Sequence, residues 1–212
     1  MYAIELKELY SYCDLHSHPE DQVLQELERQ TWLQTIAPQM ISGRMQGRFL
    51  SMISKLKQPR YILEIGTFTG YSAICLAEGL MDQGELHTLE ISNDFDHIRE
   101  QYAMPSIFAK KIVWHKGDAS EIIPNLNYSW DIVFLDAAKN KYLEYLELLE
   151  SKMLPGSILI ADNVLWYGKV LEEKKDEETT VLDQFSKRLR SSTNWETQMF
   201  PLRDGISISI KK

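Results

Sequence analysis

The fold class of this chain follows from a stretch of nine residues, Glu64-Ile65-Gly66-Thr67-Phe68-Thr69-Gly70-Tyr71-Ser72. It connects a short apolar run to an apolar helical run, so we interpret it as a turn between a strand and a helix. In doubly wound α/β folds, nucleotide-like ligands bind at this turn. Its glycines are spaced Gly-x-x-x-Gly and lack the Gly-x-Gly-x-x-Gly array that lets backbone approach a pyrophosphate. A ligand without pyrophosphate therefore fits better.

Around this turn, short apolar strands alternate with amphipathic helices, which predicts an α/β fold with a mostly parallel sheet and helices on both faces. The predicted strands are 61–65, 85–90, 112–116, 131–135 and 157–161. The predicted helices are 70–79, 93–104, 120–126 and 140–152. A final pair, 195–201 and 205–211, is predicted to form an antiparallel hairpin at the sheet edge. The mixed charge run 172–178 is interpreted as a solvated loop or the start of a helix.

The first part of the chain has helical periodicity. Apolar residues recur at helical spacing up to about residue 57, and Gln58-Pro59 ends the pattern because a residue before proline disfavours the α conformation. We expect residues 1–212 to form a single domain, in which an N-terminal helical segment, 1–57, packs on an α/β core, 60–212.

The composition predicts a soluble, cytoplasmic protein. The first twenty residues carry charges throughout, unlike a secretory signal, and no uncharged apolar run approaches the length of a membrane helix. Cys13 and Cys75 are interpreted as reduced, structural thiols. The net charge of −8 argues against broad affinity for nucleic acid. A basic group formed by Arg44, Arg48, Lys55, Lys57 and Arg60 could dock an RNA stem-loop, although a solvated helix face is the favoured interpretation.

Acidic residues at strand ends indicate a cofactor site. Glu90 ends the second predicted strand, where a carboxylate can accept hydrogen bonds from both hydroxyls of a ribose. Glu64 precedes the glycine turn and would place a second negative charge near the ammonium and sulfonium end of the ligand. Asp118 follows the third strand, where it can either accept a hydrogen bond from an adenine amino group or cap the next helix; both roles are compatible.

Two further strands end in metal-binding residue types. Asp136 follows the strand 131–135, and Asp162 and Asn163 follow 157–161. Because parallel strands end at the same sheet edge, these side chains should converge. Carboxylate and amide oxygens without nearby His or Cys suit Mg²⁺, with Mn²⁺ or Ca²⁺ as alternatives, rather than Zn²⁺.

Lys139 lies three residues beyond Asp136. It could remove the proton from a cation-bound hydroxyl, provided that burial and the cation lower its own pKa. The hydroxyl oxygen would then attack a sulfonium methyl group. The alternative is a surface lysine at a helix start, which the neighbouring strand-end acids disfavour.

With these residues, the chain resembles the class I, cation-dependent O-methyltransferases, the family of catechol and caffeoyl-CoA O-methyltransferases and their bacterial relatives. The resemblance rests on motifs spread along nearly the whole chain: Met40-Ile41-Ser42, Gln46-Gly47, Leu63 to Ser72, Glu90, Gly117-Asp118-Ala119, Leu135-Asp136-Ala137-Ala138-Lys139, 161–166 and Asp204-Gly205. It implies a Rossmann-like, seven-stranded sheet with a reversed C-terminal strand, in agreement with the predicted hairpin.

The resemblance also implies roles for individual residues. S-adenosylmethionine would contact Met40, Ser42, Glu64, Gly66, Phe68, Ser72, Glu90, Asp118, Ala119 and Asp136. Asp136, Asp162 and Asn163 would bind the metal, and Asp136 and Lys139 would be catalytic, with Lys139 as the general base. The acceptor pocket would be shaped by residues 39–44 and 166–169, where Tyr167 is larger than the residue often found in bacterial relatives. A homodimer is expected.

The functional hypothesis is methyl transfer to a small ortho-dihydroxy acceptor, because chelation of vicinal oxygens accounts for Asp136, Asp162 and Asn163 together. An alternative is methylation of a hydroxylated wobble uridine in tRNA. A third is a non-catalytic cofactor-binding protein, which the retained metal ligands and lysine disfavour. A nicotinamide-dependent oxidoreductase is disfavoured by the missing phosphate-binding glycines.

Overall fold

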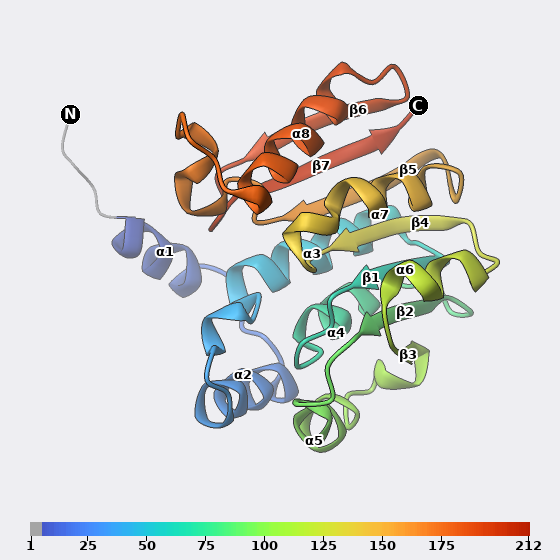
Figure 1. Ribbon diagram of the computed structural model, residues 1–212. Coiled ribbons are helices and arrows are strands. Elements are labelled where there is room, and N and C mark those ends of the chain that lie inside the picture. The colour runs from blue at the N-terminus through green and yellow to red at the C-terminus, as the bar shows by residue number, and fades with distance from the viewer. Residues whose placement is uncertain (1–5) are drawn as a thin grey trace.

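The computed structural model describes residues 6–212, which form a twisted sheet covered by helices (Figure 1). The strands of this part of the chain are β1 (Tyr61–Ile65), β2 (Glu85–Glu90), β3 (Ile112–Lys116), β4 (Trp130–Leu135), β5 (Met153–Asp162), β6 (Trp195–Phe200) and β7 (Ile206–Lys211). They lie in the order β3-β2-β1-β4-β5-β7-β6. β7 is antiparallel to both β5 and β6, and the other neighbours pair in parallel. The predicted α/β fold with a reversed C-terminal strand is confirmed.

The helices are α1 (Leu6–Leu15), α2 (Gln22–Gln34), α3 (Gly43–Lys57), α4 (Tyr71–Ala77), α5 (Asp96–Ile98), α6 (Ala119–Ile122), α7 (Tyr142–Glu150) and α8 (Glu177–Ser191). Two predicted helices are shorter than expected. The helix predicted at 93–104 is α5 followed by a π-helical turn, Arg99–Ala103. The helix predicted at 120–126 is α6 followed by a 3₁₀ turn that contains Pro124, which has no N–H to donate.

The charge run 172–178 contains both predicted structures, because residues 172–176 form a loop and α8 begins at Glu177. Asp176 caps α8 by accepting a hydrogen bond from the backbone N–H of Thr179 at 2.8 Å. Leu182, Phe185 and Leu189 of α8 are buried, so this helix, which was not predicted beyond its start, covers part of the sheet.

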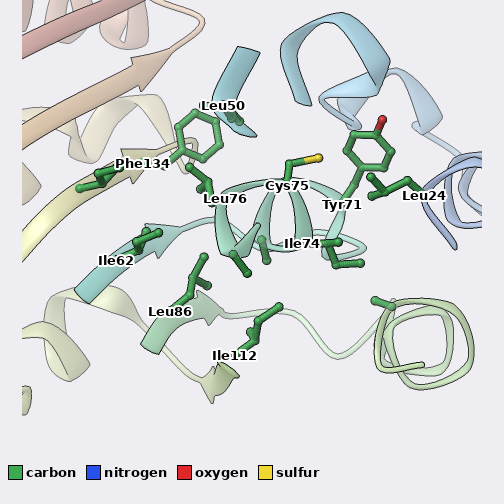
Figure 2. Close-up of a cluster of buried hydrophobic side chains, with 14 of the residues drawn as sticks. Leu24, Leu50, Ile62, Tyr71, Ile74, Cys75, Leu76, Leu86, Ile112 and Phe134 are labelled. Carbon is green, nitrogen blue, oxygen red and sulfur yellow. The ribbon is translucent and has the colours of Figure 1, made fainter. Parts of the chain in front are cut away.

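Apolar side chains pack on both faces of the sheet, because successive strand residues point to opposite faces. On β4, Ile132 and Phe134 join the cluster formed with α2, α3, α4 and α5, whereas Val133 and Leu135 join the cluster formed with α6, α7 and α8. In Figure 2, strand residues such as Ile62 and Leu86 lie beside the side chains of α4 in the first cluster. The parallel strands are thus buried on both faces.

The N-terminal helices contribute to this core. Leu24 and Leu27 of α2 and Leu50 of α3 are fully buried in the first cluster. Cys13 and Cys75 are free thiols, as predicted, and burial raises the pKa of Cys75 to about 12. Among residues 6–212, no helix has the length and apolar character needed to cross a membrane.

The order of the strands reverses between β1 and β4, which is where open α/β sheets form a ligand crevice. Here the backbone N–H of Asp136 donates to the carbonyl of Ile65 at 2.9 Å. Gly66 has a φ of 101°, and a Cβ at this position would lie 1.9 Å from the carbonyl oxygen of Asp136. Only glycine allows the two strand ends to approach this closely.

We therefore predict that Gly66→Ala destabilises the fold by at least about 3 kcal/mol, from a disfavoured positive φ and from overpacking. Gly168→Ala is the matched control, because Gly168 also has a positive φ (78°) but its Cβ would meet no atom within 4 Å. This control should lose only about 1–2 kcal/mol. Urea denaturation of both variants measures the difference, and equal losses would show that the ends of β1 and β4 separate easily.

Candidate active site

A cavity of about 680 Å³ opens at the carboxyl ends of the central strands. It is lined by residues that end or follow β1, β2, β3, β4 and β5, by residues 39–42, and by Arg203. Nearly all the site residues predicted from the sequence line it, namely Met40, Ser42, Gly66, Phe68, Ser72, Glu90, Asp118, Ala119, Asp136, Lys139, Asp162 and Asn163. The volume is in the range usual for small-molecule and cofactor sites.

Glu90 is held rigidly at the cavity wall. One carboxylate oxygen accepts a hydrogen bond from the N–H of Phe68 at 2.9 Å, and the other accepts from the N–H of Ser92 at 2.8 Å. Each carboxylate oxygen can accept more than one hydrogen bond, so both retain acceptor capacity toward the cavity. This arrangement fits a ligand with two vicinal hydroxyls, such as a ribose.

Glu64 is the predicted site residue that does not line the cavity; its side chain is fully buried behind the wall. Its Oε2 accepts a hydrogen bond from the Thr88 hydroxyl at 2.5 Å, and its Oε1 has no hydrogen-bond partner. Burial raises the pKa of Glu64 to about 8, so the carboxyl is neutral at pH 7. The predicted contact of Glu64 with a cofactor stays a prediction.

Asp118 does cap α6, as one of its two predicted roles required. Oδ1 accepts a hydrogen bond from the N–H of Ser120 and Oδ2 accepts one from Lys141 Nζ, both at 2.8 Å. These contacts lower the pKa of Asp118, and the hydrogen bond from Lys141 contributes most. Since Asp118 also lines the cavity, the predicted contact with adenine remains open.

Lys139 is buried rather than on the surface, with 6% of its area exposed. Its Nζ donates to Asp136 Oδ1 at 2.9 Å and to the Tyr142 hydroxyl at 3.0 Å. Burial by itself lowers the pKa of Lys139, but Tyr142 and Asp136 outweigh it and raise the pKa. Without a cation, Lys139 is thus a protonated partner of Asp136, and the role of general base, which was predicted for burial together with a bound cation, stays a prediction.

Asp162 is a second buried acid. Its Oδ2 accepts a hydrogen bond from Gln46 Nε2 at 2.6 Å, and its Oδ1 accepts one from the N–H of Asn163 at 2.8 Å. Burial, together with the negative charge of Asp136, raises the pKa of Asp162. The two carboxylates therefore repel each other in a poorly solvated place, and Lys139 is the cation that the structure puts beside them.

The donor chemistry around these acids fits a hard divalent cation, because two carboxylates and the Asn163 amide all offer oxygen. Within the described residues, no group of three or more His, Cys, Asp or Glu side chains is arranged to hold a metal ion. Asn163 would be the third protein donor beside the two carboxylates.

Backbone strain is concentrated at the cavity. Six non-glycine residues in the described part of the chain have positive φ, and five of them line the cavity: Phe68, Asn163, Trp166, Tyr167 and Arg203. The sixth, Gln58, ends α3. Strained non-glycine backbone tends to gather at functional sites because only surrounding contacts maintain it.

Three site residues were not assigned a role from the sequence: Gln46, Tyr142 and Arg203. The buried Tyr142 hydroxyl connects Lys139 Nζ to the backbone oxygens of Leu135 and Asp162, at 3.2 and 2.9 Å. The sequence holds one indication that Gln46 is special, because it is a polar residue on the apolar face of α3. It holds no such indication for Arg203, because the contacts of Arg203 are with residues about 160 positions away.

A comparison with known families settles the class of this site: a model described as "O-methyltransferase" matches residues 14–212. The chain belongs to the O-methyltransferase family. This confirms the resemblance found in the sequence and the assignment of the enzyme as an S-adenosylmethionine-dependent O-methyltransferase.

Relatives of this O-methyltransferase are named for catechol and for caffeoyl-CoA. A catechol O-methyltransferase of Niastella koreensis is 35% identical over 136 residues, which are 62% of each chain. A caffeoyl-CoA O-methyltransferase of Populus kitakamiensis is 31% identical over 175 residues, 77% of this chain and 74% of the relative.

Solved structures agree over nearly the full length. TomG, an O-methyltransferase of Streptomyces achromogenes in tomaymycin synthesis, was solved with SAM; it is 27% identical with a TM-score of 0.90, over 97% of this chain and 96% of that chain. An O-methyltransferase of Bacillus cereus in complex with SAH is 25% identical with a TM-score of 0.88, over 97% of each chain.

The neutral Glu64 gives a pH prediction. A carboxyl whose pKa rises from 4.5 to about 8 on folding makes the folded state bind one more proton than the unfolded state between these values. The stability that this proton provides is lost as pH rises from 4.5 toward 8, at up to about 1.4 kcal/mol per pH unit. Glu64→Gln should remove this slope, so its free energy of unfolding relative to wild type should increase with pH. Urea titrations at several pH values test this, and parallel curves would mean that Glu64 is ionised when folded.

Proposed function

We propose that this O-methyltransferase transfers the methyl group of S-adenosylmethionine to one hydroxyl of a small aromatic acceptor with two vicinal hydroxyls. A divalent cation, Mg²⁺ with Mn²⁺ or Ca²⁺ as alternatives, would be bound by Asp136, Asp162 and Asn163. The observation that supports this proposal is a single cavity that contains both Glu90 and the buried group of Asp136, Lys139 and Asp162.

The cofactor would extend between these two ends. Glu90 would accept hydrogen bonds from the ribose, and Asp118 lies beside it for the adenine. The other predicted contacts that line the cavity are Met40, Ser42, Gly66, Phe68, Ser72, Ala119 and Asp136, and the remaining one is Glu64, which is buried. This order directs the sulfonium methyl toward Asp136 and Lys139.

Trp166 and Tyr167 provide an aromatic wall for the acceptor. Both line the cavity, with ring centroids 5.4 Å apart, and Lys139 Nζ lies 5.9 Å from the Trp166 ring centroid. A flat aromatic ring packed here would hold its hydroxyls near Lys139 and the acids. Tyr167 is 78% exposed, so it would form the outer rim.

When bound, the cation would supply Lewis-acid chemistry that lowers the pKa of the acceptor hydroxyls and fixes their orientation. The acceptor hydroxyl loses its proton, its oxygen forms a bond to the methyl carbon, and the carbon–sulfur bond breaks. Lys139 can accept this proton only as a neutral amine, so its ammonium proton must first be released to solvent. Binding of Asp136 to the cation would favour that release, because it would weaken the ion pair between Asp136 and Lys139. Tyr142 would keep the Lys139 amine in place.

Methylation of tRNA is the second candidate, and the basic residues that would support it are largely occupied. Arg48 and Lys55 both pair with Glu78 at 2.6 Å, Lys57 donates to the carbonyl of Gly156, and Arg44 donates to that of Ser17. Glu78 offsets part of the charge of Arg48 and Lys55, and the hydrogen bonds of Lys57 and Arg44 to carbonyls restrict how these side chains can reach a phosphate, so the small-molecule acceptor is favoured. A homodimer and a cytoplasmic location stay predictions.

The first test is methyl transfer from labelled S-adenosylmethionine to a catechol, a caffeoyl ester, and unmodified or hydroxylated tRNA, with Mg²⁺ and with EDTA. We expect labelling of a catechol or a caffeoyl ester that EDTA abolishes. A monohydroxy analogue of the catechol is the control and should not be labelled. Labelling confined to tRNA would contradict the proposed acceptor, and cofactor binding without labelling would favour the non-catalytic alternative.

Asp162→Ala should abolish turnover and leave affinity for S-adenosylhomocysteine nearly unchanged, because the predicted adenosyl contacts lie on the earlier strands. Asp183→Ala is the control, since Asp183 pairs with Lys175 and Lys187 on the surface of α8. Kinetics and calorimetry measure the two properties. Loss of cofactor binding together with turnover would show that the cation site has been misplaced.

A further inference from the structure

Arg203 lies in the turn between β6 and β7 with a φ of 52°. A left-handed backbone is strained for arginine and unstrained for glycine. Its side chain nevertheless extends across to the N-terminal part of the chain and lines the cavity. The side chain therefore contacts the cavity wall from a backbone conformation that favours glycine.

The guanidinium of Arg203 binds three backbone carbonyls of one segment. Nη2 donates to the carbonyl of Gln39 at 3.0 Å, and Nη1 donates to the carbonyl of Ile41 at 2.8 Å and also to that of Ser42. The segment Gln39–Ser42 carries the predicted cofactor contacts Met40 and Ser42. Ile41 anchors the segment in the hydrophobic core, and Arg203, from the far end of the chain, binds its backbone carbonyls.

The same guanidinium reaches a buried acid through Gln46. Arg203 Nη1 lies 3.2 Å from Gln46 Oε1, and Gln46 Nε2 donates to Asp162 Oδ2 at 2.6 Å. Gln46 is fully buried, and its two partners fix the orientation of its amide, since the oxygen faces a donor and the nitrogen faces an acceptor. Arg203, Gln46 and Asp162 form a continuous chain of hydrogen bonds.

The next residues of the same turn bind the loop that follows β5, which forms the other side of the cavity. The carbonyls of Asp204 and Gly205 accept hydrogen bonds from Leu165 and Val164 at 3.0 and 3.1 Å. The Asp204 carboxylate accepts one from the N–H of Tyr167 at 2.6 Å. One turn therefore joins both walls that border the buried acids.

We propose that Arg203 is a positioning residue: it clasps Gln39–Ser42 against the β6–β7 turn and, through Gln46, holds the Asp162 carboxylate in place. Its effect on ligand affinity rests on the proposed function, whereas its hold on residues 39–42 does not. The strained backbone is what lets the guanidinium reach this segment from a tight turn.

Arg203→Gly and Arg203→Ala together separate positioning from stability. Both remove the clasp, but only glycine relieves the backbone strain. Three properties are measured: melting temperature, hydrogen exchange of the amides in 39–46, and affinity for S-adenosylhomocysteine. Exchange reports on the clasp because the N–H groups of Met40 and Ile41 donate to the carbonyls of Ala37 and Pro38, at 3.1 Å each, and these hydrogen bonds should open more often once the segment is released.

We expect both variants to increase exchange in 39–46 equally and to weaken S-adenosylhomocysteine binding equally, although Arg203→Gly melts at the higher temperature. Gln58→Gly is the matched control, because Gln58 has a similar φ of 50° but does not line the cavity. It should keep wild-type exchange and binding.

The link through Gln46 has its own readout. Gln46→Leu should weaken binding of Mn²⁺ alone, followed by its paramagnetic resonance signal, by about tenfold, as is usual when a group that orients a ligand is removed. It should leave the exchange of residues 39–42 unchanged.

Unchanged exchange in both Arg203 variants, or a binding loss that simply follows melting temperature, would overturn the clasp. If wild type bound neither S-adenosylhomocysteine nor Mn²⁺, the proposed function would fail, while increased exchange in the Arg203 variants would still support the clasp.

Discussion

The contact between the ends of β1 and β4 is the constraint on which the site depends. The carbonyl oxygen of Asp136 occupies the space that a Cβ of residue 66 would need, so the two strands end together only because residue 66 is glycine. This contact brings the turn after β1, with Phe68, next to the acid after β4. It also lies where the strand order reverses, so the surrounding loops diverge and leave a cavity between them.

Burying ionisable groups around this cavity requires compensation, because a charge removed from water is costly without a partner. Each group is compensated differently. Glu64 is neutral, with a pKa of about 8. Lys139 stays charged because Asp136 and Tyr142 bind it, and Asp162 is held by Gln46. The two acids near Lys139 retain an excess of negative charge, which is the physical basis for proposing a cation there.

The cavity wall is built from segments far apart in the chain, and several of them are strained. Gln46 and Asp162 are separated by 116 residues, and Arg203 and Gln39 by 164. Positive φ values at Asn163, Trp166, Tyr167 and Arg203 show that the loops after β5 and between β6 and β7 are held by tertiary contacts rather than by local preference. The N-terminal helices and the C-terminal hairpin therefore complete a site whose centre belongs to the parallel strands.

The sequence by itself determined the alternation of strands and helices, the reversed hairpin at the C-terminus and the edge at which Glu90, Asp136 and Asp162 lie. These features depend on local periodicity and on the rule that parallel strands end at one edge, so a single chain displays them. Helix lengths near Arg99 and Pro124 were mispredicted because a π turn and a missing N–H donor changed the local geometry. Only the tertiary structure decided that Glu64 is neutral, that Lys139 is held as an ammonium, and that Gln46, Tyr142 and Arg203 belong to the site. Burial and long-range hydrogen bonds set these properties, and neither has a periodicity that a sequence can show.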